Sequence, residues 1–307
     1  MRSAIIGAGG IGAYFGGLLA RDGHDVTFVA RGAHLQALQT GGLTVYSQRG
    51  DFRLESVRAV GATAGLPVQE LVVICTKTYD NAGAIDLARP LVGPETLLLT
   101  LQNGPDPIGP LAAAFGDRVL GGACYIEVFI EAPGVIRQPS SLADVAMADP
   151  RGLAPRLEGL VAAFAAAGIR ARAESDARSL LWRKAVLISA YGAVAASSRQ
   201  SMGALRASPE AWALLQDVLA EHEAVALADG AQVAGVAAGA AQVAASFPDG
   251  NKPSILRDLE RGKPLEVDAL QGYVVASARR LGVPAPKTEA LWALLKLLDQ
   301  QNRAAAR

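Results

Sequence analysis

A glycine-rich loop near the start of the chain constrains its fold more than any other feature. The run Gly7-Ala8-Gly9-Gly10-Ile11-Gly12 follows an apolar segment at residues 4–6 and opens a helical segment at residues 11–21. In this context the first glycine permits a tight turn, the second lets the backbone approach a pyrophosphate, and the third allows close helix packing. The N-terminus of the helix attracts the same anion. All six residues are therefore predicted to bind a dinucleotide, with an ordinary turn as the weaker alternative.

The first half of the chain alternates short β-branched segments with amphipathic ones, which is typical of a parallel sheet flanked by helices. Strands are expected at residues 4–6, 26–29, 71–76, 96–101 and 119–124. Residues 42–46 and 52–60 are expected as extra strands around a turn, and residues 134–138 and 143–148 as an antiparallel extension.

From about residue 175 the pattern changes to long Ala- and Leu-rich helical stretches, interrupted at sites such as Ser208-Pro209 and Gly282-Val283-Pro284. A chain of 307 residues favours two domains. The expected fold is therefore an α/β Rossmann domain with a doubly wound, mostly parallel sheet over residues 1–174, followed by an all-α domain over residues 175–307.

The charge balance narrows the range of partners. The chain has 29 basic and 29 acidic residues, so no strong field attracts nucleic acid or an anionic membrane surface. The apolar stretch at residues 185–196 is shorter than the roughly 20 residues of a membrane span. Neither nucleic acid nor a membrane is expected as a partner.

The two cysteines give no sign of a metal site or a disulfide framework. Cys75 and Cys124 lie in separate apolar segments with no neighbouring Cys or His cluster. The chain also enters its first strand at once, which leaves no room for a secretion signal. We therefore expect a cytoplasmic protein with no bound metal.

Residues at the ends of the predicted strands indicate which dinucleotide binds. Arg31 follows the second strand, where an NAD enzyme usually places an acid. A guanidinium can bind a 2′-phosphate, so NADPH is predicted, with a solvated surface arginine as the alternative.

Two further polar residues follow predicted strands. Lys77 follows the strand at residues 71–76, where it could touch the cofactor or serve only as a solubilising end residue. Asn103, after the strand at residues 96–101, is predicted to contact cofactor and substrate, although Asn-Gly-Pro is also a turn sequence.

Lys184 in the run Leu181-Trp182-Arg183-Lys184 is the candidate for the chemical step. Reduction of a carbonyl by hydride builds negative charge on oxygen, which a proton or a fixed positive group must meet. Lysine can supply either. A lone lysine on a helix is more often a surface residue, so this role needs support from the rest of the sequence.

That support comes from a resemblance over nearly the whole chain to the ketopantoate reductase (2-dehydropantoate 2-reductase) family. Its members are NADPH enzymes with a Rossmann domain and a helical domain, and they reduce 2-dehydropantoate to pantoate on the route to coenzyme A. The motifs that carry the resemblance appear in the family's order: residues 7–12, Arg31, Thr76-Lys77, Gln102-Asn103-Gly104, residues 181–184, residues 253–258 and Leu265-Glu266-Val267-Asp268.

The resemblance assigns roles to four of these residues. It implies that Lys184 is the proton donor and that Asn103 serves cofactor and substrate. It places Ser254 at the substrate carboxylate and Glu266 near the nicotinamide ribose and the lysine. Glu266 could equally be a solvated helix residue, and Ser254 an N-cap.

One departure bears on the substrate. Family members usually present asparagines four and eight residues after the lysine, where this chain has Ile188 and Gly192. A wall formed by these two positions is expected to be less polar and roomier, and a pocket without donors cannot strongly select a hydroxyl. A bulkier or more apolar 2-oxo acid than 2-dehydropantoate is therefore the hypothesis. Ser189 and Tyr191 are the alternative polar contacts if the helix is rotated.

The residues and the resemblance together predict an NADPH-dependent reductase that converts a 2-oxo acid to a 2-hydroxy acid. The substrate that the resemblance implies is 2-dehydropantoate, reduced to pantoate, with a related bulkier 2-oxo acid beside it. A 2-hydroxy acid dehydrogenase of the same superfamily is the first alternative. A non-catalytic NADPH-binding regulatory protein is the second. Helical domains of this kind often pair, so a homodimer is left open.

Overall fold

The computed structural model describes residues 1–152 and 155–305. Contacts between Cα atoms divide the chain into two compact units. The first comprises Met1–Gln102 and Pro107–Ala177, and the second comprises Asn103–Asp106 and Arg178–Arg307. The short segment Asn103–Asp106 thus belongs to the helical unit, although the sequence places it between strands of the first.

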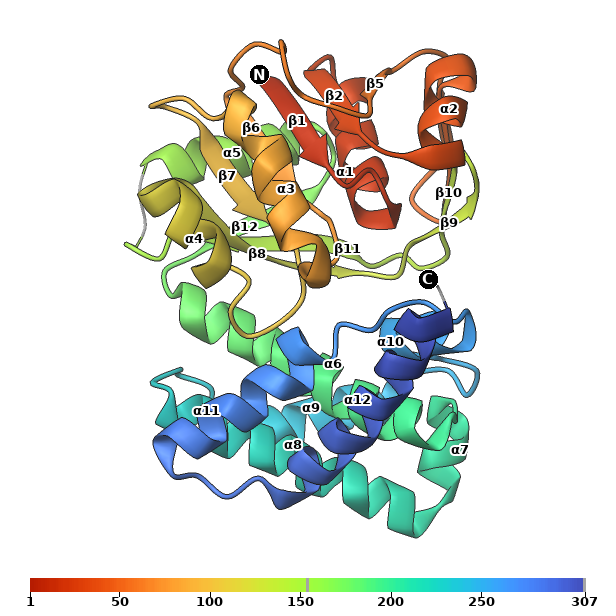
Figure 1. Cartoon of the computed structure of the whole chain (residues 1–307), viewed down its shortest axis with the longest axis vertical. Helices are drawn as coiled ribbons and strands as arrows, with labels where there is room; N and C mark the ends of the chain where they lie inside the picture. Colours follow the sequence, from red (N-terminus) through yellow and green to blue (C-terminus); the bar gives the residue numbers. More distant parts are fainter. Residues whose placement is uncertain (153–154, 306–307) are drawn as a thin grey trace. The chain divides into compact units, whose positions relative to one another are not determined.

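The first unit is built on an eight-stranded sheet (Figure 1). From edge to edge its strands are β12 (Arg170–Glu174), β11 (Ala143–Ala148), β8 (Val119–Ile126), β7 (Leu97–Thr100), β6 (Leu71–Ile74), β1 (Arg2–Ile6), β2 (Asp25–Val29) and β5 (Arg58–Val60). The strands from β8 to β5 are parallel and follow the doubly wound order 3-2-1-4-5-6. Strand β11 runs antiparallel to β8. The predicted Rossmann fold is confirmed.

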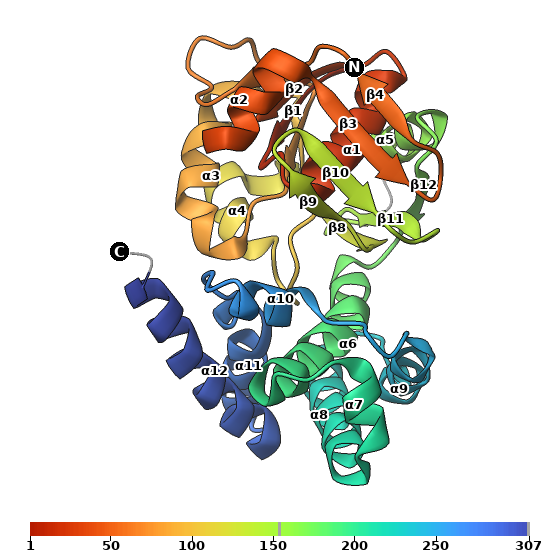
Figure 2. The same ribbon diagram turned by 90° about the vertical axis from the view of Figure 1, so that its right-hand side faces the viewer.

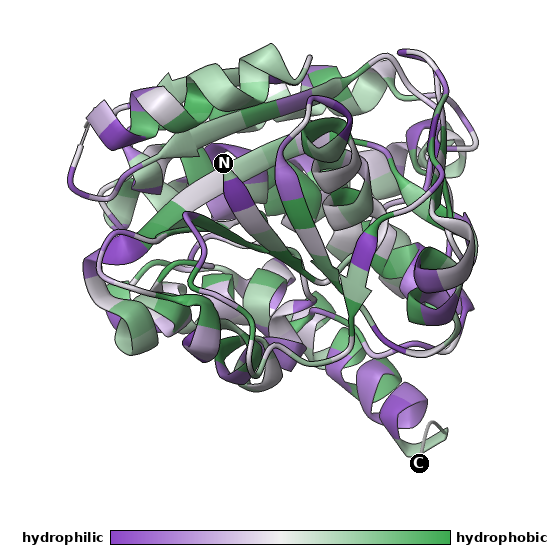
Figure 3. Cartoon of the chain, turned by 90° about the horizontal axis from the view of Figure 1, so that it is seen from above, coloured by the Kyte–Doolittle hydropathy of each residue, from purple (hydrophilic) through white to green (hydrophobic). Residues whose placement is uncertain are grey.

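Helices cover both faces of this sheet, which explains why its central strands are mostly apolar and buried. Every residue of β6 is buried, and Figure 3 shows hydrophobic stretches along the strands. Helices α1 (Gly10–Arg21) and α5 (Pro155–Ala166) share one core with the sheet. Helices α3 (Asn81–Ala88) and α4 (Gly109–Phe115) share the core on the other face.

A second, four-stranded sheet differs from what the sequence predicted. Its strands in order are β4 (Phe52–Leu54), β3 (Leu43–Ser47), β10 (Val135–Gln138) and β9 (Phe129–Ala132) (Figure 2). The single strand predicted at residues 52–60 is therefore two strands, β4 and β5, in different sheets. The two strands of the predicted antiparallel extension lie in different sheets. Strand β11 runs antiparallel to β8 in the large sheet, whereas β10 pairs antiparallel with β9 and parallel with β3 in the second sheet. Strands β9 and β12 were not predicted.

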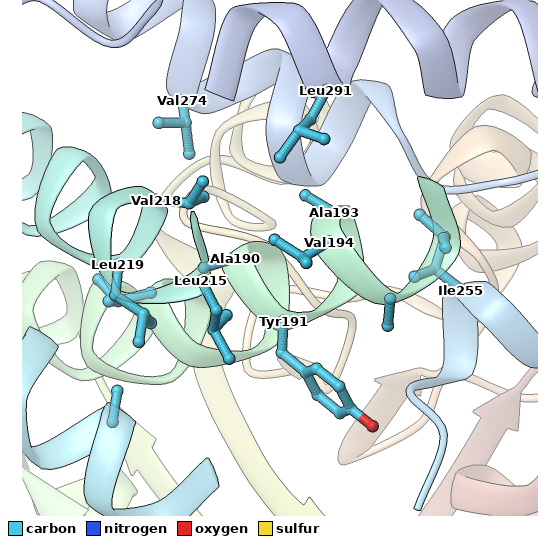
Figure 4. Packing of buried hydrophobic residues seen from close by; sticks show 14 of the residues in the cluster. Ala190, Tyr191, Ala193, Val194, Leu215, Val218, Leu219, Ile255, Val274 and Leu291 are labelled. Carbon is cyan, nitrogen blue, oxygen red and sulfur yellow. The ribbon is translucent and has the colours of Figure 1, made fainter. Parts of the chain in front are cut away.

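The second unit consists of helices around the long α6 (Ala177–Ser198). The others are α7 (Met202–Ala207), α8 (Pro209–Ala228), α9 (Val236–Ser246), α10 (Ser254–Glu260), α11 (Tyr273–Leu281) and α12 (Pro286–Ala305), with one π-helical turn, η4 (Asp268–Gly272). Figure 4 shows buried side chains of α6, including Tyr191 and Val194, among residues of α8, α10, α11 and α12. Within the described residues, no helix is both long and apolar enough to span a bilayer.

A buried polar chain links α8 to α6. His222 has no exposed surface. Its Nδ1 lies 2.7 Å from the carbonyl oxygen of Val218, and its Nε2 lies 3.0 Å from Ser189 Oγ. Because a carbonyl can only accept, Nδ1 carries the hydrogen and Nε2 accepts from the serine hydroxyl. Burial lowers the pKa of His222 from 6.5 to about 4, so the ring is neutral at pH 7.

Because its pKa is lowered, His222 is expected to make the folded protein less stable in acid. The unfolded chain binds a proton at His222 near pH 6.5, whereas the folded chain does so only near pH 4. The stabilisation is therefore complete above pH 6.5 and is lost as pH falls to 4, by about 3 kcal/mol in all. Denaturant unfolding at several pH values measures it, with His222→Gln as the comparison. If both proteins lose stability in parallel over this range, the assignment to His222 is wrong.

Candidate active site

The glycine loop has the geometry that a bound dinucleotide requires. Gly7 has a φ of +92°, and a Cβ there would lie 2.7 Å from the backbone nitrogen of Thr76. A Cβ on Gly12 would lie 2.3 Å from the carbonyl oxygen of Gly7. Only glycine fits at these positions, because both neighbours are backbone atoms that cannot move aside. The loop therefore holds the N-terminus of α1 tightly against β1 and β6.

Gly9 differs from Gly7 and Gly12 because the space beside it is open. It is the N-cap of the 12-residue helix α1, and a Cβ built on it would meet no atom within 4 Å. Nothing in the folded chain therefore requires glycine at this position. Open space at the positive end of a helix suits a pyrophosphate that approaches the backbone. The loop residues thus fit a dinucleotide.

The carboxyl ends of β2 and β6 flank this loop, because β1 lies between those two strands. Arg31, the N-cap of α2 (Gly32–Gly41), follows β2. Its Nη2 lies 2.5 Å from Oδ2 of Asp80, the last residue of the short helix η1 (Thr78–Asp80) that follows β6. Lys77 is the N-cap of η1. The sequence placed Arg31 and Lys77 at this edge but gave no indication of Asp80.

Gln102 is a positioning residue that the sequence analysis quoted in a motif but to which it gave no role. Its side chain is buried, and Nε2 donates to the carbonyl oxygen of Thr76 at 3.0 Å and to Asn81 Oδ1 at 2.7 Å. These bonds tie the end of β7 to the segment after β6. The adjoining residue, Asn103, therefore leaves the sheet from a fixed point. Its position directly before Asn103 was the one available signal.

Asn103 and Lys184 meet in the structure. Lys184, half-buried on α6, donates from Nζ to Asn103 Oδ1 at 2.7 Å. The next residue, Gly104, has a φ of +127°, and a Cβ there would lie 2.8 Å from the carbonyl oxygen of Ala269 in η4. The loop thus lies against the π-turn, and π-turns are frequent at functional sites. Lys184 and Asn103, which are 81 residues apart in sequence, thus form a hydrogen-bonded pair in which the lysine ammonium donates to an amide oxygen.

The other two residues with assigned roles also belong to the helical unit. Glu266, two residues before η4, is 6% exposed, and its carbonyl oxygen accepts a hydrogen bond from the backbone N–H of Leu270 in η4. Ser254 is exposed and is the first residue of α10, following the N-cap Pro253. The solvated-helix interpretation of Glu266 does not agree with its burial. Ser254 is not the N-cap, and its role toward a substrate stays a prediction.

Gly192 does not provide the extra room that the sequence suggested. It is buried, and a Cβ there would lie 3.0 Å from Cγ2 of Ile255 and 3.6 Å from Nε2 of Gln271. Ile255 thus fills the space that a side chain at position 192 would need. The expectation of a roomier wall is therefore wrong at this position. With Ile188 half-buried one turn earlier, the predicted loss of polar groups remains.

The alternative polar contacts on α6 are engaged inside the helical unit. Ser189 Oγ bonds His222, and its carbonyl oxygen accepts from Gln271 Nε2 at 2.8 Å. Tyr191 donates its hydroxyl to the carbonyl oxygen of Asn251 at 2.7 Å. The helix is therefore not rotated in the way that would turn these two residues toward a ligand.

Comparison with known sequences places the chain in a family. The ketopantoate reductase PanE/ApbA model matches residues 3–150, and the model of the family's C-terminal domain matches residues 176–299. This chain belongs to the ketopantoate reductase family. A 2-dehydropantoate 2-reductase of Mesorhizobium japonicum is 31% identical over 97% of this chain and 98% of its own. The family member described here is accordingly an oxidoreductase that acts on CH–OH groups with an NAD(P) cofactor.

Solved structures agree with this assignment. A PanE/ApbA family ketopantoate reductase from Ralstonia eutropha superimposes with a TM-score of 0.91 at 32% identity, covering 99% of this chain and 100% of its own. A 2-dehydropantoate 2-reductase from Geobacter metallireducens gives 0.92 at 31% identity, covering 97% and 99%. A D-mandelate dehydrogenase in ternary complex with NADH gives 0.89 at 19% identity, covering 99% of each chain, and shares the fold.

Proposed function

We propose that the protein reduces a 2-oxo acid to a 2-hydroxy acid with NADPH. The observation that carries the proposal is the 2.7 Å bond between Lys184 Nζ and Asn103 Oδ1. A lysine with a purely solubilising role would extend into water rather than sit half-buried on an amide oxygen. Arg31 at the end of β2 supports NADPH, because a guanidinium can bind a 2′-phosphate.

The chemistry assigned to these residues follows from their functional groups. When bound, the cofactor supplies a hydride to the carbonyl carbon. Lys184 then donates a proton to the carbonyl oxygen, which otherwise carries the developing negative charge. Asn103 accepts one ammonium hydrogen through Oδ1, which orients the other two and leaves its own Nδ2 hydrogens for a ligand. Glu266 is proposed to keep the lysine charged and to contact the nicotinamide ribose.

The substrate that the relatives' names suggest is 2-dehydropantoate. We propose a branched 2-oxo acid whose side chain is recognised by shape rather than by its hydroxyl group. The side chains of Ile188 and Ile255 carry no donor or acceptor, and Gly192 has no side chain. Gln271, whose Nε2 would lie 3.6 Å from a Cβ at Gly192, donates that nitrogen to the carbonyl oxygen of Ser189. A site that hydrogen-bonds a hydroxyl rejects the analogue without it by about 10⁴-fold or more, whereas an apolar pocket discriminates only weakly.

A matched pair of substrates tests this proposal. Trimethylpyruvate is 2-dehydropantoate without its terminal hydroxyl group, so the two differ in that group alone. We expect kcat/KM values within about tenfold of each other, because no side chain of the apolar wall is left unpaired by the analogue. Steady-state NADPH oxidation measures both. A preference for 2-dehydropantoate of roughly a thousandfold or more in kcat/KM would show that a polar group of the site hydrogen-bonds the hydroxyl.

Oxidation of a 2-hydroxy acid is the second candidate. The fold shared with D-mandelate dehydrogenase permits it. In addition, an acid from the segment after β6, Asp80, pairs with Arg31 at the position where NAD enzymes usually have an acid. Measuring both reaction directions with both cofactors separates the candidates. A regulatory protein without turnover is disfavoured, because the Lys184–Asn103 pair has no role in such a protein.

Assembly and location are also proposals. A ketopantoate reductase from Staphylococcus aureus with this fold is described as dimeric. In this chain Leu294 and Leu297 of α12 are 53% and 58% exposed, which is consistent with pairing of two copies. Cys75 and Cys124 do not form a disulfide, which is consistent with the reducing cytoplasm.

A further inference from the structure

The ion pair between Arg31 and Asp80 joins two segments at the cofactor edge of the sheet. Its guanidinium nitrogen and carboxylate oxygen lie 2.5 Å apart. The Arg31 side chain is 86% exposed and that of Asp80 is 34% exposed. Arg31 is therefore an accessible cation whose nearest described counterion is fixed on a different element. Because the pair follows β2 and β6, on either side of β1, it flanks the glycine loop.

We propose that Asp80 is a cofactor-specificity residue that weakens the preference for the 2′-phosphate of NADPH and allows NADH to bind as well. The inference rests on the proposed dinucleotide site. A phosphate that reaches Arg31 brings about two negative charges close to the carboxylate already paired there. The same carboxylate can accept a hydrogen bond from the 2′-hydroxyl of NADH. Asp80 thus disfavours one cofactor and favours the other.

The geometry favours this role over a purely structural one. A surface ion pair contributes little to stability, and most of the Arg31 side chain is in water. The hydrogen bond to Asp80 uses only one of the two terminal nitrogens of Arg31, which leaves further donors for a ligand. Arg31 can therefore bind a phosphate without leaving Asp80, and the repulsion from Asp80 then persists in the complex.

Substitution of Asp80 by asparagine separates charge from shape. Asparagine keeps an oxygen that can accept from Arg31 and removes the negative charge. We expect Asp80→Asn to lower the Kd for NADPH about five- to tenfold and to leave the Kd for NADH unchanged or a few-fold higher. Titration calorimetry of the whole protein without substrate measures both constants. Asp86→Asn is the matched control, since Asp86 is 80% exposed on α3, near Arg89, and its loss removes the same charge.

Each outcome bears on the inference. Tighter NADPH binding in Asp80→Asn, but not in Asp86→Asn, supports it. Unchanged or weaker NADPH binding overturns it and makes Asp80 a support for Arg31. Equal tightening of both cofactors, or an equal effect of Asp86→Asn, also overturns it. If the unmodified protein binds neither cofactor, the proposed function fails as well, so the two failures are distinguishable.

Discussion

Replacing Lys184 by alanine is expected to lower kcat by roughly a hundredfold to ten-thousandfold, the usual contribution of a positioned proton donor. Affinity for NADPH should stay nearly unchanged, because the ammonium is proposed to act on charge that develops only in the transition state. The substitution also leaves Asn103 Oδ1 without the donor that it has at 2.7 Å. Rapid-mixing measurement of NADPH oxidation gives kcat, and fluorescence titration gives the affinity.

Lys184→Arg sharpens this test. Arginine keeps a positive charge and hydrogen-bond donors for Asn103, but it does not release a proton at ordinary pH. If Lys184 donates a proton, the arginine variant should be nearly as slow as the alanine variant. Full activity in Lys184→Arg would mean that the position supplies a fixed charge and that the proton comes from elsewhere. Full activity in Lys184→Ala would remove the residue from the mechanism.

The second large effect is expected in the glycine loop. Gly12→Ala places a methyl group 2.3 Å from the Gly7 carbonyl oxygen and 2.8 Å from an Ile5 side-chain carbon. Overpacking of this kind costs about 2–3 kcal/mol, and here it also displaces the loop that is proposed to hold the pyrophosphate. Both the free energy of unfolding and NADPH affinity should fall. Denaturant unfolding and calorimetric titration measure the two quantities.

Gly9→Ala is the matched control for that prediction. A Cβ on Gly9 meets no protein atom within 4 Å, so stability should be unchanged. The Kd for NADPH should nevertheless rise at least tenfold, because the methyl group occupies the proposed pyrophosphate position. This change corresponds to a loss of about 1.4 kcal/mol of binding free energy. A Gly9→Ala variant that binds NADPH normally would contradict that position. Gly12→Ala with unchanged stability would contradict the packing argument.

Local signals explain which parts of the fold were predictable. The β1–loop–α1 unit is encoded by adjacent apolar residues and glycines, and its prediction is confirmed. Strand β12 was missed because Arg170, Arg172 and Glu174 make it look like a polar loop, although it pairs with β11. Strand β9 is short and largely exposed, so its sequence lacks a buried face. The split between β4 and β5 depends on which sheet each joins, which neighbouring residues do not determine.

Long-range contacts limited the prediction of the site. The resemblance gave Asn103 and Lys184 separate roles, but their hydrogen bond joins a loop and a helix 81 residues apart. Ile255 against Gly192 and Asp80 beside Arg31 are of the same kind. In each case a contact between residues distant in sequence changes what a predicted residue can do. The sequence therefore supplied candidate site residues, whereas their neighbours in space became visible only in the folded chain.

The most direct test of the central claim measures products. The purified protein is incubated with NADPH and, in separate reactions, with 2-dehydropantoate and trimethylpyruvate, and the 2-hydroxy acid and NADP⁺ are quantified together. We predict one 2-hydroxy acid per NADPH consumed, and almost none with Lys184→Ala. If the protein binds NADPH but forms no 2-hydroxy acid from either substrate, or if Lys184→Ala forms it equally fast, the proposed reduction is contradicted.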